Sequence, residues 1–259
     1  MHRITDDFEP REDETLDTLT CGNLSILQKR KGYRYSLDAY LLAAFVEEKP
    51  GTRVLEIGSG SGVVSILLAA MKGLTVTGVE IQRELAEMSV RSVQRAGLAD
   101  QVNIRCCDIR DYSGRKVEAV VTNPPYRPLD TGRINPDSEK AIARHELALD
   151  LEGVLLKAHE MLVPGGRFYI VYPAWRLPDL LCSMRSRHIE PKHVQCVHTS
   201  ALSTAEICLV RGLRGGGKEC SVGRPIFVYT EEGTYHKEVA EVFRSLSLHK
   251  KPLTSRRDT

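Results

Sequence analysis

Four consecutive residues near the middle of the chain could do chemistry on a planar amine. Asn123-Pro124-Pro125-Tyr126 directly follows residues 117–122, an apolar and β-branched stretch typical of a buried strand. The prolines fix the backbone and remove two N–H donors, which leaves carbonyl oxygens, an amide and an aromatic ring. The Asn123 side-chain oxygen and the Pro124 carbonyl can accept both hydrogens of an exocyclic –NH2 group, while Tyr126 stacks on the base. This arrangement aims the nitrogen lone pair at an electrophile and predicts alkylation of an exocyclic amine; a functionless Pro-Pro turn is the alternative.

A glycine-rich loop lies upstream, between a predicted strand at 53–57 and a predicted helix at 63–71. It reads Glu56-Ile57-Gly58-Ser59-Gly60-Ser61-Gly62. Glycines let the backbone turn tightly and approach a ligand, and the helix N-terminus beyond them favours a negative group. The spacing departs from Gly-x-Gly-x-x-Gly and no phosphate-binding lysine follows, which argues against a P-loop. We predict a cofactor site that includes Glu56, Gly58, Gly60 and Gly62, with a ligand-free glycine turn as the alternative.

Acidic residues follow the next two predicted strands. Glu80 comes about 20 residues after the glycine loop, the separation at which a carboxylate accepts the hydroxyl groups of a cofactor ribose. Asp108 could accept the amino group of a cofactor adenine. Because ligands bind at the carboxyl ends of strands in open α/β sheets, one cofactor site is predicted. It would contain Glu80, Ile81, Asp108, Ile109 and Asn123. The alternative for Glu80 is a cap on the following helix.

The order of the predicted elements indicates an α/β fold. Strands alternate with helices, which implies a parallel sheet with helices on both faces. We predict a Rossmann-like sheet of seven strands with an antiparallel C-terminal hairpin, preceded by an N-terminal hairpin around Gly22-Asn23. Segments with a strand pattern lie at 53–57, 75–80, 102–106, 117–122, 167–172, 192–198 and 205–211, and residues 225–229 look like a further strand. The predicted helices lie at 37–46, 63–71, 82–96, 151–162, 175–187 and 235–246. Residues 123–150 show no period, which is typical of a functional loop.

Charge is distributed unevenly along the chain. The first 20 residues carry seven acids and two arginines, a balance of −5, so the rest of the chain carries +7. We expect residues 1–18 to be a disordered acidic leader, because they offer little apolar surface to bury. A single domain would span 19–248, with its hairpin and first helix at 19–50, and 249–259 would be a flexible basic tail.

Two basic clusters could bind RNA phosphates or could simply be solvated surface. The clusters are Lys29, Arg30, Lys31 and Arg34, interleaved with Tyr33 and Tyr35, and Arg211, Arg214, Lys218 and Arg224. A salt-bridged loop is favoured over RNA contact for His145, and helix packing over base stacking for Trp175. Seven cysteines without a Cys-x-x-Cys pair predict reduced thiols in a cytosolic protein and no metal site.

Together these residues resemble the class I S-adenosylmethionine-dependent methyltransferases. Asn-Pro-Pro-Tyr after the fourth strand is similar to the motif of their amino-methyltransferase subset, which acts on adenine N6, cytosine N4, guanine N2 or protein glutamine. Three further segments resemble the bacterial valine-tRNA adenine-N6 methyltransferase family. They are residues 32–42, Ala143-Arg144-His145-Glu146, and the stretch from Gly217 through Pro225–Tyr229 to Gly233-Thr234-Tyr235.

The resemblance runs from Leu19 to Leu246 and implies a methyltransferase domain at 19–248. It implies transfer of a methyl group from S-adenosyl-L-methionine to the N6 amine of an adenine in structured RNA, in tRNA near the anticodon. Asn123, Pro124 and Tyr126 would be catalytic, and Asp38 would help to close the cofactor pocket. The expected setting is cytoplasmic tRNA processing, with no membrane and no stable protein partner. Glu56 departs mildly from the family pattern, since some members carry Asp there.

Other functions share parts of this pattern. A protein-glutamine methyltransferase has the same tetrapeptide but usually carries a helical domain before the catalytic domain. A DNA adenine methyltransferase usually adds a target-recognition domain. Guanine methylation in rRNA and a non-catalytic cofactor- or RNA-binding protein also remain as alternatives.

Overall fold

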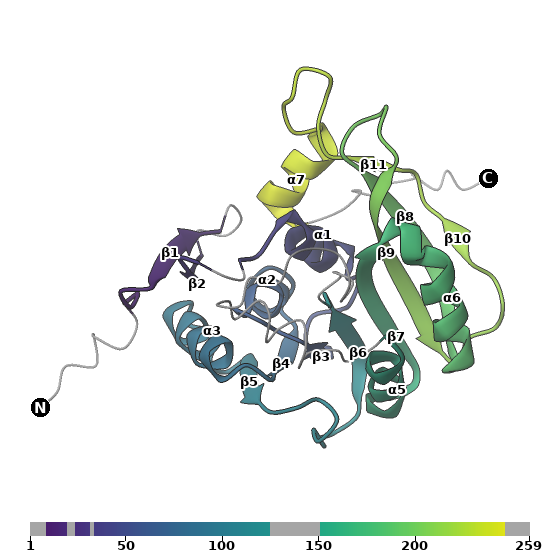
Figure 1. Ribbon diagram of the computed structural model, residues 1–259. Helices are drawn as coiled ribbons and strands as arrows, with labels where there is room; N and C mark the ends of the chain where they lie inside the picture. The colour runs from purple at the N-terminus through teal and green to yellow at the C-terminus, as the bar shows by residue number, and fades with distance from the viewer. Residues whose placement is uncertain (1–8, 20–23, 32–33, 125–150, 247–259) are drawn as a thin grey trace, which may run out of the picture.

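A nine-stranded mixed β-sheet runs through the centre of the molecule (Figure 1). The computed structural model describes residues 9–19, 24–31, 34–124 and 151–246. The strand order is β10-β8-β9-β7-β6-β3-β4-β5, and β11 also pairs with β8. The strands of this sheet are β3 (Arg53–Ile57), β4 (Thr75–Glu80), β5 (Val102–Cys106), β6 (Val117–Thr122), β7 (Leu162–Pro173), β8 (Ile189–His198), β9 (Ala205–Arg214), β10 (Ser221–Val222) and β11 (Ile226–Phe227).

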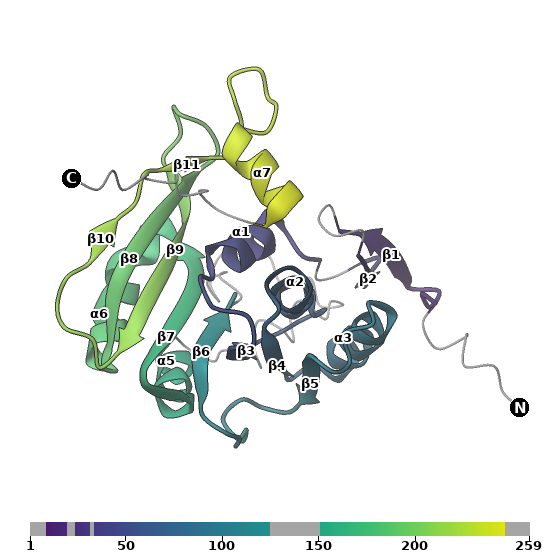
Figure 2. The same cartoon turned by 180° about the vertical axis from the view of Figure 1, so that it is seen from behind.

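Helices cover both faces of the sheet, as the alternation of strands and helices predicts. They are α1 (Leu37–Phe45), α2 (Val63–Lys72), α3 (Arg83–Arg95), α5 (Leu151–Met161), α6 (Leu177–Ser186) and α7 (Lys237–Ser245). Two separate cores result: Val54 and Val121 join the core under α1, α2 and α7, whereas Leu55 and Val120 join the core under α5 and α6. Figures 1 and 2 show these two helical layers from opposite sides. The α/β fold class is confirmed.

The parallel part of the sheet consists of β5, β4, β3, β6 and β7, each paired with its neighbour in parallel. Beyond β7 the sheet becomes antiparallel, because β9 pairs antiparallel with both β7 and β8. The predicted antiparallel C-terminal hairpin is therefore confirmed. The predicted count of seven strands was wrong. The two-residue strands β10 and β11 add to β8: β11 lies within the predicted strand at 225–229, whereas β10 is too short for its alternation to predict it.

The N-terminal hairpin forms a small sheet of its own. It joins β1 (Glu14–Thr18) to β2 (Ser25–Lys29), so its strands lie further apart in the sequence than the predicted 19–27. The expectation of disorder over 1–18 is wrong for β1. Glu14 is only 2% exposed and forms an ion pair with Arg91 of α3, and this partner is distant in sequence.

Two connections bear on the site. Among the described residues, no helix links β5 to β6, and residues 107–116 form an extended loop instead. Most of the segment after β6 lies outside the described residues, and with it lie Tyr126 and Ala143-Arg144-His145-Glu146. In the part of the chain that is described, no helix is long and apolar enough to cross a membrane.

One hydrogen bond anchors the hairpin to the main domain, and it can be tested. The Leu27 N–H donates to Ser92 Oγ at 3.0 Å in a buried environment. Ser92→Ala should lower the free energy of unfolding by about 1–3 kcal/mol, because this N–H would stay buried without an acceptor.

Ser89→Ala is the matched control for this experiment. Ser89 lies one turn earlier on α3, is equally buried, and its hydroxyl finds no hydrogen-bond partner within the described residues. Its removal should leave the free energy of unfolding unchanged or raise it, because no hydrogen bond is lost and a buried unpaired hydroxyl is removed. Equal destabilisation of both variants in urea titrations would show that the bond does not anchor the hairpin.

Candidate functional site

The register of the parallel strands brings the predicted site residues to one edge of the sheet. Ile57 of β3 pairs with Val79 of β4 on one side and with Thr122 of β6 on the other. Gly58, Glu80 and Asn123 are the next residues along these three strands. Since neighbouring strands lie about 4.8 Å apart, the three residues follow one another along the carboxyl edge.

The glycine loop leaves open space at one position and packs tightly at another. Gly58 has φ +72°, and a Cβ atom added there would meet no described atom within 4 Å. Gly62 has φ +85°, and a Cβ atom there would lie 2.2 Å from Ser89 Oγ on α3. Gly58 therefore leaves room for a ligand, whereas Gly62 allows the start of α2 to approach α3. Gly60 lies between them and donates its N–H to Glu80.

Glu80 is buried at the end of β4, with 4% of its surface exposed. One carboxylate oxygen accepts the Gly60 N–H at 2.7 Å, and the other accepts the Gln82 N–H at 2.9 Å. Burial raises the pKa of the Glu80 carboxyl. A carboxylate oxygen can accept a second hydrogen bond, so both oxygens can still receive the hydroxyls of a ribose. The hydrogen bond from Gln82 also supports the start of α3. Glu80 could therefore cap this helix and bind a cofactor ribose at the same time.

Glu56 lies beneath the glycine loop rather than on its surface. It is 2% exposed, and its carboxylate accepts a hydrogen bond from Ser65 Oγ in the first turn of α2. Burial raises the pKa of Glu56 to about 8. This position suits a residue that holds the loop from below, and direct contact of Glu56 with a cofactor stays a prediction.

Asp108 follows β5 as predicted, but its carboxylate already has a partner. It accepts the Arg110 backbone N–H at 2.8 Å and the Arg110 Nε–H at 3.0 Å, and this guanidinium lowers the pKa of Asp108. A cofactor amine would share the carboxylate with Arg110. Ile109 is 3% exposed and belongs to the core on the α5 side, whereas Ile81 is half-buried beside Glu80.

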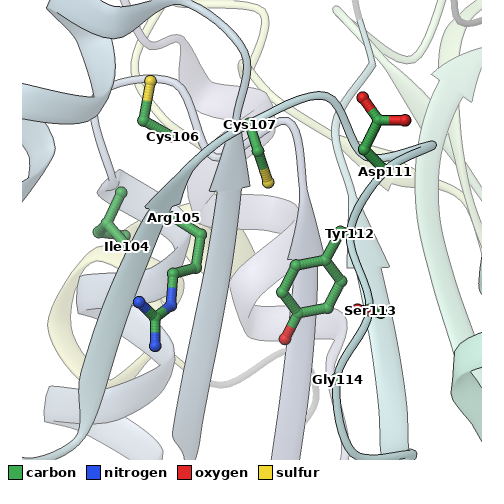
Figure 3. A pocket seen from close by; sticks show the side chains of 8 residues that line it. All are labelled: Ile104, Arg105, Cys106, Cys107, Asp111, Tyr112, Ser113 and Gly114. Atoms are coloured by element: carbon green, nitrogen blue, oxygen red, sulfur yellow. The ribbon is translucent and has the colours of Figure 1, made fainter.

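A cavity of about 580 Å³ opens along β5, next to Asp108 (Figure 3). The side chain of Arg105 projects from β5, and that of Tyr112 projects from the loop that connects β5 to β6 in place of a helix. The lining residues are Ile104, Arg105, Cys106, Cys107, Asp111, Tyr112, Ser113 and Gly114. Glu80 and Asn123 are not among them, so the cavity adjoins the carboxyl edge without containing the predicted site.

Asn123 and Pro124 lie half-buried directly after β6. Just before them, Thr122 Oγ1 donates to the Ile57 carbonyl at 3.0 Å, which joins the ends of β6 and β3. Asp38 is half-buried in the first turn of α1, where burial raises the pKa of its carboxyl and Glu206 at the start of β9 raises it further. Asp38 thus reaches the same edge from the side of β9.

Several residues outside this edge have structural partners. Lys29 lies 2.7 Å from Asp13 and 3.0 Å from Glu84, and Arg34 pairs with Asp17, so acids neutralise much of the first basic cluster. Trp175 is 68% exposed, so its expected packing in a helix was wrong. Among the described residues, no group of three or more His, Cys, Asp or Glu side chains could hold a metal ion.

A glycine loop after β3, a buried acid at the end of β4 and the antiparallel strand β9 beside β7 together define a class I methyltransferase fold. The chain belongs to the methyltransferase small domain family, whose pattern matches residues 37–176. S-adenosylmethionine is its cofactor. The open space at Gly58 and the two acceptor oxygens of Glu80 fit this cofactor.

Two solved structures show the same fold. A "predicted O-methyltransferase", protein Atu636 from Agrobacterium tumefaciens, superposes with a TM-score of 0.67 at 18% identity, over 82% of this chain and 97% of that chain. TYW2 of P. horikoshii in complex with MeSAdo gives a TM-score of 0.57 at 12% identity, over 80% and 73% of the two chains.

Curated relatives named tRNA1(Val) (adenine(37)-N6)-methyltransferase are similar in sequence. The Porphyromonas gingivalis (strain ATCC 33277) protein is 32% identical over 63% of this chain and 68% of its own length. The Aeromonas hydrophila protein is 28% identical over 80% and 86%. The Bacteroides fragilis (strain YCH46) protein is 31% identical over 52% of this chain, and the match spans only 58% of that relative.

The burial of Glu56 predicts a pH-dependent stability. Its carboxyl has an ordinary pKa of 4.5 and a pKa of about 8 in the fold. Between these values the folded protein keeps a proton that the unfolded chain has lost, so stability should fall as pH rises. The slope would reach about 1.4 kcal/mol per pH unit and level off above pH 8.

Glu56→Gln should flatten this decline, because the amide does not titrate. The contribution of Glu80, whose pKa is also raised, would remain in the variant. Urea unfolding of both proteins at a series of pH values measures the difference. Parallel curves for the wild type and the variant would contradict the assignment.

Proposed function

We propose that this protein is a methyltransferase that acts on the N6 amine of an adenine in RNA, within tRNA near the anticodon. The observation that carries the proposal is the position of Asn123-Pro124, which directly follows β6 and neighbours the glycine loop after β3. The names of the curated relatives support an adenine of tRNA as the target. The proposal includes a place in cytoplasmic tRNA modification.

The carboxyl edge divides into a cofactor side and a substrate side. Bound S-adenosylmethionine supplies an electrophilic methyl group. The residues on the cofactor side are Gly58, Gly60, Gly62, Glu80, Ile81, Asp108 and Ile109, with Glu56 beneath the loop and Asp38 closing the pocket from α1. Glu80 would hold the ribose through its two buried oxygens, and Asp108 would accept from the adenine of the cofactor. Asn123, one strand further along, would lie where the amine meets the methyl group.

On the substrate side, Asn123 and Pro124 orient the amine. The Asn123 side-chain oxygen and the Pro124 carbonyl would each accept one hydrogen of the amine. Its lone pair then lies out of conjugation and faces the methyl group. No strong base is required, because alkylation makes the amine acidic and its proton can leave to water. Tyr126 would stack on the target base, which must be unpaired or flipped out to reach this position.

The test of the proposed function offers several substrates in parallel. The purified protein receives S-adenosylmethionine with a labelled methyl group and total tRNA, total rRNA, DNA or cell protein, followed by nucleoside or amino-acid analysis. N6-methyladenosine in tRNA is the expected product. Label in guanine of rRNA or in protein glutamine would replace the proposal with one of its rivals.

Two matched variants separate the cofactor side from the substrate side. Asn123→Ala should slow single-turnover methyl transfer on the order of 10²-fold, by analogy with the loss of one preorganised hydrogen-bonding group. Its affinity for S-adenosylmethionine should stay near that of the wild type. Glu80→Gln should weaken cofactor binding, because one acceptor oxygen becomes a donor, while transfer at saturating cofactor recovers.

Calorimetry for the cofactor and rapid-quench transfer give both quantities for each variant. If Asn123→Ala turns over at the wild-type rate, the amine-orienting mechanism is wrong and the motif is only a rigid turn. Unchanged affinity in Glu80→Gln would remove Glu80 from the cofactor site.

A further inference from the structure

Trp175 forms an exposed ladder with two neighbouring side chains. It lies in the short 3-10 helix η1 (Ala174–Arg176), which directly follows β7 and has no buried residue. The Arg176 guanidinium lies 5.2 Å from the centroid of the Tyr172 ring and 5.8 Å from that of the Trp175 ring. Tyr172 is 4% exposed and forms the base of the ladder, whereas Trp175 at its outer end is 68% exposed.

The ladder has a fixed position on a rigid element. Pro173 precedes η1 and Pro178 lies in the first turn of α6, so two residues with fixed φ flank it. The buried Tyr172 belongs to the core on the α5 and α6 side. Arg176 spans the gap between a core ring and a surface ring, and its Nε lies 3.8 Å from the carboxylate of the exposed Asp179.

This position adjoins the substrate side of the edge. Thr122 of β6 pairs with Ile170 of β7, so Asn123 neighbours Val171, and β7 ends two residues later at Pro173. Trp175 therefore stands just above the edge at the strand next to Asn123. The turn between β8 and β9 ends at the same edge and carries Leu202, which is 93% exposed.

The Trp175 indole does not pack in a hydrophobic core, so core packing does not explain a tryptophan at this position. A large aromatic side chain left in water loses the stabilisation that burial would give, about 1.5–3 kcal/mol for a large apolar group. An indole face backed by a cation, beside a site for a planar base, has the chemistry of a base-stacking platform. Stacking on an aromatic ring does not depend on the identity of the base, because every base has a π-face.

We propose that Trp175, supported by Arg176 and Tyr172, stacks an unpaired nucleobase that flanks the methylated adenine. The inference rests on the proposed RNA substrate. An adenine that leaves its stack to reach Asn123 also exposes the faces of its neighbours, and the indole would replace one of the lost stacking partners. Trp175 would thereby position the strand while Asn123 orients the amine.

The chain offers a direct probe, because Trp175 is its only tryptophan. Intrinsic fluorescence therefore reports on this one side chain. Titration of the Asn123→Ala protein with a single-stranded oligoribonucleotide should quench the emission and saturate at the affinity found by filter binding. Binding without any change in the emission would overturn the proposal.

Kinetics give a second readout. Trp175→Ala should raise the KM for RNA by about 5- to 150-fold, the size expected for the loss of one base–aromatic stack, and leave the cofactor affinity unchanged. Trp175→Phe should restore most of the loss, since a ring is retained. The control is Leu156→Ala, which removes another exposed apolar side chain, 46% exposed and in the middle of α5.

The outcomes separate the two proposals. If no RNA accepts methyl groups, the proposed function fails, whatever Trp175 does. If RNA is methylated and Trp175→Ala matches the wild-type KM, only the platform fails. Self-association of the wild type that Trp175→Ala abolishes, with KM unchanged, would assign the indole to contact with a second copy and overturn the proposal.

Discussion

The carboxyl edge depends on one buried carboxylate. Glu80 accepts the N–H groups of Gly60 and Gln82, so a single side chain joins the glycine loop after β3 to the start of α3. A glycine-rich loop has few side chains that could fix its conformation. A buried carboxylate that accepts two backbone N–H groups stabilises that conformation instead. The same carboxylate keeps lone pairs for a ligand. Under the proposed function, the shape of the loop and the recognition of the cofactor are coupled through Glu80.

The parallel register arranges the remaining chemistry along this edge. Moving from β4 through β3 to β6 and β7, the chain presents Glu80, Gly58, Asn123 and then the Trp175 ladder. Each step is one strand wide, about 4.8 Å. Under the proposed function, cofactor, amine and flanking base therefore meet in this order. The Thr122 bond to Ile57 keeps the two central strand ends aligned.

The described part of the acidic N-terminal stretch, from residue 9 to residue 18, belongs to the fold. Asp13 and Asp17 pair with Lys29 and Arg34, and the buried Glu14 pairs with Arg91 of α3. The acidic residues that predicted a disordered leader and the basic residues that predicted an RNA-binding cluster are therefore largely paired with each other. Exposed pairs of this kind contribute little stability, about 0–1 kcal/mol, so the buried contacts of Glu14 and Leu27 anchor the hairpin.

The sequence by itself determined the alternation of strands and helices, the glycine loop and the placement of Asn123 after β6. These features depend on local hydrophobic periodicity and on the backbone preferences of glycine and proline, which act over a few residues. Only the tertiary structure decided that Glu56 lies beneath the loop, that Arg110 holds Asp108, that β10 extends the sheet, and that Trp175 faces solvent. The identity of a side chain states which contacts it can make. Which contact it does make depends on burial and on partners brought close by the fold, and no local pattern contains that information.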